Sequence, residues 1–510
     1  MELNNEVMLL ISENRIKATP VPDFLIKSIS EQGYSLEAAI ADLIDNSVTA
    51  NSSVIQVLVD SETEPFQLFL ADNGEGMSAD ELVNNMQFPS SNPEGVRTLE
   101  DLGRFGLGMK AASFSQTRKF TVLSRKKGDD KYFGLTWDVD HLVKTKKWEL
   151  LVSSKLEIDK LVNDFNKLNQ DFNGGISGFS PNTIVIWSGL YKFEKYLKEY
   201  NRKKALHREI VQNTTEHLGI VFHRFLDSSH NPLTIRVNNS HIRPFNPFPE
   251  SQQSLRKLEY RQKDFGNDNI KLEGFILPSS SIKEAQQPNS GWTTPNKSLL
   301  DMEGVYIYRS NRLIIYGGWN GLIRKAPRLQ LARLRVDIGN KADHLLHLNV
   351  AKSQVIIPHD LVEAFKGYIE ELTSEAEKEF YNRGIRKFNH KSNSKDIKFL
   401  KKTHSNKGPL LELNHDFPLL KEIVKSCDHK QKIQLFLLIR MINTTINKIR
   451  DTHENVPFYR CEETKEKDFF DFILSMKSEG FSSELIKKNL ISELGIDLKT
   501  LPTELLEILE

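Results

Sequence analysis

One stretch of the sequence, from Ser35 to Ala50, restricts the fold more than any other. It reads SLEAAIADLIDNSVTA, and its apolar residues follow the i, i+3, i+4, i+7, i+8 spacing of a helix that packs one face on a core: Leu36, Ala39, Ile40, Leu43 and Ile44. We therefore predict one continuous helix with Ser35 as its N-cap residue. At about 100° per residue, Asp42 and Asn46 share one flank of this helix, where they can reach a common ligand. Asp45 lies nearly opposite the apolar stripe, and we expect it to face solvent. A solvated helix edge is the alternative interpretation of the polar flank.

Strand-like runs surround this helix in the first 200 residues, at 53–59, 66–72, 119–125 and 182–190. Together with the helical periodicity they indicate an α/β layer arrangement. A helix over about 201–225 leads into further alternating runs, which we expect to form a separate mixed sheet: LTIRVNN, IKLEGFILP, GVYIYRSNRLIIYGGW and LLHLNVAKSQVIIP. A glutamate-rich helix is predicted at 360–383.

The remainder of the chain changes in composition. Residues 390–409 are rich in Lys, Ser and Asn, as in an exposed linker, whose basic charge could alternatively contact phosphates. Residues 410–510 carry helical patterns and are predicted to form a small helical domain. A chain of 510 residues is too long for one core and suggests about three domains.

Bulk composition excludes several classes of protein. The net charge is only +1, so any nucleic-acid surface must be local. Two cysteines, Cys427 and Cys461, are too few for a disulfide framework or a cysteine-based zinc site, which fits a reducing compartment. The N-terminus lacks the basic start of a signal peptide, and no window approaches eighteen apolar residues. We therefore expect a cytoplasmic protein with no membrane partner.

A carboxylate followed by two alternate glycines comes directly after the strand FQLFLAD, in the sequence DNGEGM (72–77). Asp72 can accept a hydrogen bond from an exocyclic amine. Gly74 and Gly76 allow the backbone to pass close to a flat ligand, with Met77 completing the turn. A tight turn without a ligand uses the same residues.

A glycine-rich segment, LGRFGLGMKAASFS (102–115), precedes a helix-favouring sequence. Gly103, Gly106 and Gly108 let backbone N–H groups converge on an anion, and Lys110 can add a point charge. The spacing is neither that of the P-loop nor that of a dinucleotide-binding loop. We therefore expect a phosphate that is bound in another way.

In this order, an acid-plus-Asn helix, a DxGxG turn and a GxxGxG loop resemble the GHKL ATPases, the group of gyrase, heat-shock chaperone, histidine kinase and MutL. The resemblance covers roughly residues 30–190 and implies a two-layer α/β sandwich (the Bergerat fold) that binds ATP and Mg²⁺. It implies that Asn46 coordinates Mg²⁺ and that Asp72, assisted by Thr183, recognises the adenine amino group. It also implies a lid that covers the phosphates through the backbone of Gly106, Leu107 and Gly108.

One position departs from the pattern of this family. Hydrolytic members carry a glutamate four residues before the metal-binding Asn, as general base, whereas this sequence has Asp42. The aspartate carboxylate is set back by somewhat over ~1 Å, which is costly for a positioned proton transfer. Slow hydrolysis, which we favour because the carboxylate is kept, and a nucleotide switch with vestigial hydrolysis both remain open.

The second region also carries a resemblance. GVYIYRSNRLIIYGGW (304–319) is similar to a strand-turn segment in the transducer domain of MORC-type and related prokaryotic GHKL ATPases, a mixed α/β domain like ribosomal protein S5. HLNVAKSQVIIP resembles the segment that delivers a lysine to the γ-phosphate, which implies Lys352. A surface lysine is the alternative. Arg309, Asn311 and Arg312 are expected to pack a domain interface or to touch a partner.

The sequence thus predicts an α+β protein with five segments: an N-terminal arm (1–30), a GHKL ATP-binding domain (31–200), a transducer-like domain (201–389), a basic linker (390–409) and a helical C-terminal domain (410–510). Too few residues precede the nucleotide helix for the phospho-accepting hairpin of a histidine kinase, and we find no topoisomerase cleavage motif. His207, His217 and His223 are interpreted as helix-surface or core residues.

Three functions remain open. The first is an ATP-gated switch or dimeric clamp, with arm exchange in an ATP-dependent homodimer, acting on duplex DNA in genome defence (antiviral) or repair. The second is a chaperone-like protein-remodelling ATPase with a protein partner from its own pathway, and the third is a non-hydrolysing scaffold.

Overall fold

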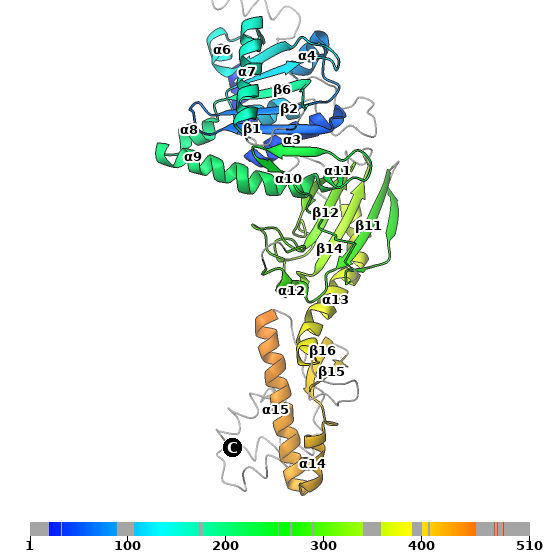
Figure 1. Cartoon of the computed structure of the whole chain (residues 1–510). Helices are drawn as coiled ribbons and strands as arrows, with labels where there is room; N and C mark the ends of the chain where they lie inside the picture. The colour runs from blue at the N-terminus through cyan, green and yellow to red at the C-terminus, as the bar shows by residue number, and fades with distance from the viewer. Residues whose placement is uncertain are drawn as a thin grey trace, which may run out of the picture. The chain divides into compact units, whose positions relative to one another are not determined.

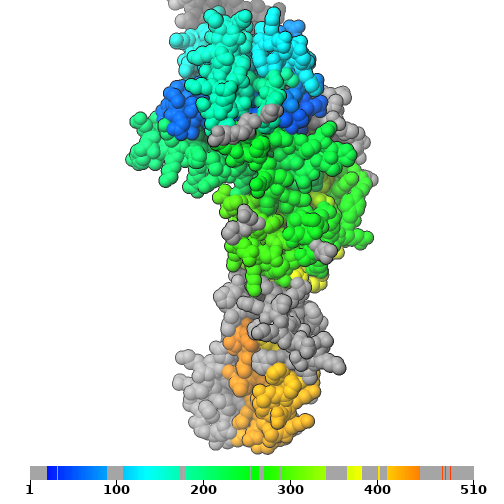
Figure 2. All heavy atoms as spheres, viewed as in Figure 1, coloured from blue at the N-terminus to red at the C-terminus, as the bar shows by residue number. Residues whose placement is uncertain are grey.

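The computed structural model describes residues 20–31, 33–88, 107–172, 176, 178–252, 254–265, 268–287, 290–339, 359–389, 400–405 and 408–454, with single residues 474, 477 and 483. The chain divides into two compact units. The first comprises Met1–Lys325 with Leu329–Asn382, and the second comprises Ala326–Arg328 with Arg383–Glu510. Figures 1 and 2 show the whole chain, and each unit is described separately below.

The first unit begins with an eight-stranded sheet in the order β5-β4-β3-β6-β2-β1-β7-β8. Neighbouring strands are antiparallel except for β1 and β7, which are parallel. The strands are β1 (Val54–Asp60), β2 (Gln67–Asp72), β3 (Lys119–Ser124), β4 (Phe133–Asp138), β5 (Leu151–Val152), β6 (Thr183–Ser188), β7 (Thr234–Val237) and β8 (Ser240–His241).

Helices cover both faces of this sheet (Figure 1). Because side chains alternate along a strand, Leu68 and Leu70 of β2 join the core under α3, while Phe69 joins the core with Phe165 of α7 on the other face. The helices of this part of the chain are α2 (Pro22–Ser30), α3 (Leu36–Thr49), α4 (Ala79–Met86), α5 (Gly108–Phe114), α6 (Val139–Thr145) and α7 (Lys155–Asp171).

The helix predicted from Ser35 is confirmed. It is α3, spanning Leu36–Thr49 with Ser35 as its N-cap residue, although the Ser35 side chain does not bond the helix backbone. The predicted apolar positions, Leu36, Ala39, Ile40, Leu43 and Ile44, are all buried. Periodicity alone therefore located this helix and its core face.

A helical segment connects β6, in the interior of the first sheet, with β7, near one edge of the same sheet. It consists of α8 (Tyr191–Tyr196), α9 (Glu199–Arg208), the π-helix η1 (Glu209–Thr214), α10 (Thr215–Val221) and α11 (His223–Leu226). The next strand, β7, pairs in parallel with β1. The prediction that LTIRVNN belongs to the second sheet is therefore wrong, because a parallel partner can be supplied by a segment that is distant in sequence.

The second sheet, also in the first unit, has the order β10-β11-β14-β12-β13, with β9 on β11. All pairs are antiparallel except β12 with β14. Its strands are β9 (Arg256–Lys257), β10 (Arg261–Phe265), β11 (Asp268–Ile276), β12 (Gly304–Arg309), β13 (Arg312–Tyr316) and β14 (Ala332–Ile338). The short helices α12 (Ser281–Glu284) and η2 (Pro327–Leu329) lie in its connections, and the long helix α13 (His359–Asn389) follows. Tyr368 of α13 accepts a hydrogen bond from the Gly274 amide at 2.7 Å, which fixes α13 to β11.

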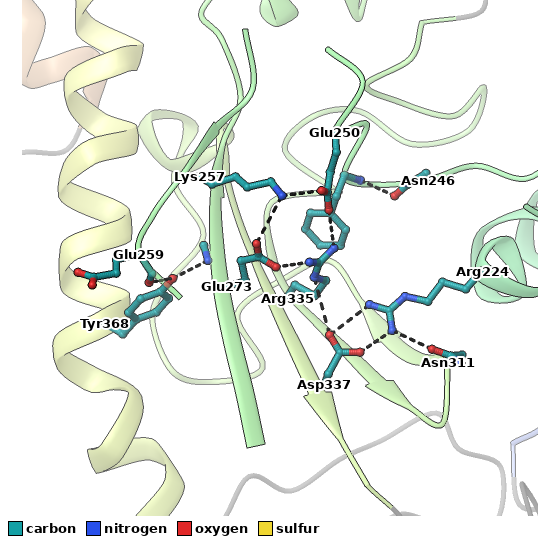
Figure 3. Close-up of polar contacts among 12 residues, drawn as sticks. Arg224, Asn246, Glu250, Lys257, Glu259, Glu273, Asn311, Arg335, Asp337 and Tyr368 are labelled. Atoms are coloured by element: carbon teal, nitrogen blue, oxygen red, sulfur yellow. Dashed lines mark hydrogen bonds and ion pairs between the residues drawn. The ribbon is translucent and has the colours of Figure 1, made fainter. Parts of the chain in front are cut away.

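A network of ion pairs crosses one face of the second sheet (Figure 3). Arg335 of β14 contacts Glu273 and Glu250, the latter at 2.9 Å. Arg224 of α11 pairs with Asp337 and lies 3.5 Å from the centroid of the Tyr308 ring. The network therefore ties the helical segment to the second sheet.

In the second unit, the described residues include a β-hairpin and two helices that follow it. The hairpin consists of β15 (Leu400–Ser405) and β16 (Gly408–Leu413), followed by α14 (Pro418–Ser426) and α15 (His429–Glu454). Asn443 of α15 accepts a hydrogen bond from the Leu413 amide at 2.9 Å, and Asn447 bonds both backbone groups of Leu411. The structure thus has a strand, β15, within the range that the sequence predicted as a linker, and a second strand, β16, that extends into the start of the predicted helical domain.

Within the described residues, no helix is both long enough and apolar enough to span a membrane.

Candidate functional site

The polar flank of α3 combines one exposed and one buried group. Asn46 is exposed, whereas Asp42, one turn earlier, is 3% exposed. The Tyr34 hydroxyl donates a hydrogen bond to Asp42 Oδ2 at 2.8 Å. The Asp42 carboxylate is therefore held by the side chain of a residue that precedes α3 in the sequence.

The prediction that Asp45 faces solvent is wrong. Asp45 is 2% exposed, and the Arg312 Nε donates to its Oδ1 at 2.8 Å. The guanidinium also lies 4.7 Å from the centroid of the Phe222 ring. A helical wheel of α3 alone could not indicate this contact, because the partner is 267 residues away in the sequence.

A two-residue turn brings Arg312 to this position. Arg309 pairs with Arg312 across β12 and β13, and the two residues between them, Ser310 and Asn311, have φ values of 46° and 68°. Positive φ at both positions is typical of the tight hairpin turns that match strand twist. Arg312 therefore packs the interface between α3 and the second sheet, one of the two roles that the sequence left open.

Asp72 lies at the end of β2 with its carboxylate buried among donors. Its Oδ1 accepts hydrogen bonds from the Ser52 hydroxyl and the Gly74 amide, and its Oδ2 accepts one from the Ser47 hydroxyl, each at 2.9 Å. Burial raises the pKa of Asp72, and these three bonds oppose that shift. A carboxylate has about four lone-pair sites, so this one has room for a further donor.

Thr183 is next to Asp72 in the sheet, since the two residues are paired across β2 and β6. The Thr183 hydroxyl is 2.9 Å from the Ser124 hydroxyl, and Ser124 Oγ also accepts a hydrogen bond from the Met77 amide at 2.9 Å. The structure thus brings Asp72, Thr183 and Met77, predicted from two distant segments, to one end of the sheet.

The glycines of the DNGEGM turn are explained by packing within the protein. A Cβ at Gly74 would lie 2.6 Å from the Ala50 carbonyl oxygen. Gly76 has a φ of +63°, and a Cβ there would lie 1.8 Å from the Arg125 carbonyl oxygen. The predicted reason for these glycines, room for a flat ligand, is thus not needed to account for them.

The described part of the glycine-rich segment starts at Leu107, the N-cap residue of α5. Among the described residues, no heavy atom outside its chain neighbours and its own helix backbone lies within 4 Å of a Cβ built at Gly108. Gly103 and Gly106 lie outside the described residues, as does Lys352 of the second region.

The Lys110 side chain differs from its predicted role. Its Nζ donates to the carbonyl oxygens of Asn85 and Gln87, at 2.7 and 2.8 Å, at the C-terminal end of α4. Burial lowers the pKa of Lys110 to about 7. The amine expected beside an anion thus satisfies unpaired carbonyls of a helix end instead.

Comparisons with known proteins agree with this geometry. A family model described as "Histidine kinase-, DNA gyrase B-, and HSP90-like ATPase" matches residues 34–173. Residues 34–173 therefore form a GHKL-type ATPase domain. The matched region contains Asp42, Asn46 and Asp72, and it ends before Thr183.

Two curated proteins are similar to parts of this chain. Chaperone protein HtpG of Hydrogenovibrio crunogenus is 27% identical over 163 residues, which are 28% of this chain and 26% of HtpG. ATPase MORC2B of Mus musculus is 31% identical over 97 residues, which are 18% of this chain and 9% of MORC2B. The chain therefore spans about a quarter or less of the length of these relatives.

Sequence analysis missed several residues of this site. Tyr34 bonds Asp42, and Ser47 and Ser52 bond Asp72, but no sequence motif includes these three hydroxyls. Ser47 and Ser52 are close to Asn46 in the sequence, which could have indicated that they belong to the site. The sequence around Tyr34 contains no pattern that indicates its contact with Asp42. Among the described residues, no cluster of three His, Cys, Asp or Glu side chains could hold a metal ion.

Proposed function

We propose that this GHKL protein is a slow Mg²⁺-dependent ATPase that works as an ATP-gated conformational switch, closing as a dimer on duplex DNA. The observation that carries the ATP site is the Asp72 carboxylate, which is buried, oriented by three donors and adjacent to the helix of Asp42 and Asn46. A buried, oriented acceptor is suited to the amino group of a purine.

Asp72 is proposed to accept a hydrogen bond from the adenine amino group. The Ser47 and Ser52 hydroxyls hold both carboxylate oxygens, so the remaining acceptor site has a fixed direction. Thr183, paired with Asp72, supplies a hydroxyl beside it. A base that lacked the exocyclic amine would leave this buried acceptor without its partner, which would select against it.

The phosphate end of the nucleotide is assigned to α3 and the glycine-rich segment. The exposed Asn46 amide supplies one oxygen ligand for Mg²⁺, an ion that keeps several waters and shares phosphate oxygens. Bound Mg²⁺ neutralises charge on the phosphates. Gly103, Gly106, Leu107 and Gly108 are proposed to donate their backbone N–H groups.

Asp42 is proposed as the general base that orients the attacking water and accepts its proton. It lies one turn before Asn46 on α3, so base and metal ligand share a rigid element. Its short side chain predicts slow turnover. Lys352 is proposed to contact the γ-phosphate from the second region, so that this region responds to the nucleotide.

The experiment that tests this function is ATP turnover with and without Mg²⁺, alongside equilibrium binding of a non-hydrolysable ATP analogue. We expect slow turnover by the wild-type chain. Asp72→Ala should weaken analogue binding about 10- to 100-fold, because a hydrogen bond to a charged group is lost. Asp42→Asn should bind the analogue normally and lose about 100-fold or more in kcat.

A matched control is Asp138→Asn, the same carboxylate-to-amide change in the same domain. Asp138 caps α6, and asparagine is an equally good N-cap residue, so binding and turnover should persist. Absence of analogue binding by the wild-type chain would overturn the ATP site. Binding by all variants without turnover would favour the nucleotide-dependent scaffold.

The client is tested separately. The resemblance of the sequence motifs to MORC-like and MutL-like proteins motivates the DNA proposal, whereas similarity to chaperone protein HtpG favours a protein client. Turnover stimulated by duplex DNA, with an affinity that falls steeply as salt is raised, supports the clamp. Stimulation by an unfolded protein and not by DNA supports the chaperone-like alternative, and size-exclusion chromatography with and without ATP tests the dimer.

A further inference from the structure

We propose that Tyr34 is a positioning residue for hydrolysis, because its hydroxyl fixes the direction of the Asp42 carboxylate. This inference rests on the proposed function, in which Asp42 is the general base. It assigns a role to a residue that lies before the nucleotide helix.

The contact itself is short and buried. The Tyr34 hydroxyl is 2.8 Å from Asp42 Oδ2, and the two residues are 2% and 3% exposed. Burial raises the pKa of Tyr34, so the hydroxyl keeps its proton and acts as the donor. A hydrogen bond to a carboxylate is among the stronger side-chain contacts, and little water competes with it here.

Tyr34 is itself held from its backbone side. Its carbonyl oxygen accepts hydrogen bonds from Lys192 Nζ at 2.7 Å and from Gln116 Nε2 at 3.3 Å. Its ring packs in the main core of the first unit. The donor therefore occupies a set position before any ligand binds, as preorganised catalytic sites require.

A fixed direction matters more for aspartate than for glutamate at this position. The shorter side chain cannot advance its carboxylate by extension, so its reach depends on how the two oxygens are turned. With Oδ2 bonded to Tyr34, the carboxylate plane is set and the position of Oδ1 follows. A misplacement of about 1 Å can cost on the order of 100-fold in rate.

The hydrogen bond from Tyr34 also has an opposing effect, because it changes the basicity of the Asp42 carboxylate. A donor to the carboxylate stabilises its charged form and makes it a weaker base, which would slow proton transfer. If positioning dominates, loss of the hydroxyl lowers kcat; if basicity dominates, loss of the hydroxyl raises it. The two effects therefore predict opposite signs.

The test compares the full-length wild-type chain with Tyr34→Phe, which removes only the hydroxyl. We expect Tyr34→Phe to lower the single-turnover rate of Mg²⁺-ATP hydrolysis about 10-fold while the Kd of a non-hydrolysable ATP analogue stays within about twofold. Tyr306→Phe is the matched control, since this fully buried hydroxyl donates to the Met302 carbonyl at 2.6 Å in the second sheet. Its rate should equal that of the wild type.

A double-mutant cycle with Asp42→Asn separates positioning from a general structural role. If Tyr34 acts through Asp42, adding Tyr34→Phe to Asp42→Asn should cause no further loss of rate. An equal loss in both backgrounds, an unchanged or raised rate in Tyr34→Phe, or a weakened analogue Kd would overturn the inference. A wild-type chain that binds the analogue without turnover would overturn the proposed hydrolysis as well, a failure visible without the variants.

Discussion

The imidazole of His223 occupies a buried position between α11 and β12, where its Nε2 is 2.7 Å from the Tyr308 hydroxyl. Burial lowers the pKa of His223 to about 3, from an ordinary value of 6.5. Between those two pH values the unfolded chain binds a proton that the folded chain does not. Stability contributed by the neutral ring is therefore present above pH 6.5 and is lost as the pH falls toward 3.

We expect His223→Gln to reduce this acid sensitivity. The wild type should lose roughly 2–3 kcal/mol of unfolding free energy through this residue between pH 7 and pH 4.5, and the variant should not. Urea unfolding of both proteins at the two pH values measures the difference. The same substitution at the exposed His207 should leave the wild-type pH dependence intact, and identical pH dependence in all three proteins would contradict the assignment.

At the scale of elements, the hairpin of β12 and β13 connects the second sheet to α3. The β12–β13 turn places Arg312 against Asp45, and both side chains are at most 5% exposed. Replacing Arg312 by alanine removes a buried charge partner of Asp45. The interface between α3 and this hairpin is thus specified by charge as well as by packing.

Arg312→Ala should therefore lower the unfolding free energy by about 3–5 kcal/mol. The control is Lys127→Ala, which removes the exposed pair of Lys127 with Glu75 and should cost about 1 kcal/mol or less. Denaturant titration of both variants tests this. If both variants lost equally little unfolding free energy, the ion pair of Arg312 with Asp45 would not contribute to the stability of the fold.

The DNGEGM turn gives a second prediction for an element. In Gly76→Ala, the alanine would have to adopt a positive φ and its Cβ would clash with the Arg125 carbonyl oxygen. We therefore expect this variant to lose well over 1 kcal/mol of unfolding free energy. Gly108→Ala meets no atom at the start of α5 and should be neutral or stabilising by up to about 1 kcal/mol. Thermal unfolding of the two alanine variants compares them, and a stable Gly76→Ala protein would contradict the packing argument.

At the scale of the whole molecule, the described site residues all belong to the first compact unit. This placement predicts that a chain ending at residue 389, the end of α13, binds the ATP analogue with the affinity of the full chain. Calorimetric titration of the two proteins measures this. A truncated protein that folds, by circular dichroism, but binds at least tenfold more weakly would show that the second unit contributes to the site.

The sequence by itself determined the local features. The period of apolar residues located α3 and its buried face, and the alternating runs located β1, β2, β3 and β6. These features depend on neighbours within a few residues, so their physical cause is present in the local sequence. The order of three short motifs likewise indicated the GHKL-type ATPase domain that the family model matches at residues 34–173.

Only the tertiary structure decided which groups meet across long separations. It buried Asp45 against Arg312, joined β7 to the first sheet and turned Lys110 toward the end of α4. Each of these outcomes depends on a partner outside the local segment, whose position follows from the packing of whole elements and not from local periodicity. The strands β15 and β16 are neighbours in sequence, but their contacts with Asn443 and Asn447 of α15 are likewise tertiary. Tyr34 is only eight residues from Asp42, but its position is set by the packing of its ring in the core and by the hydrogen bonds that Lys192 and Gln116 donate to its carbonyl oxygen.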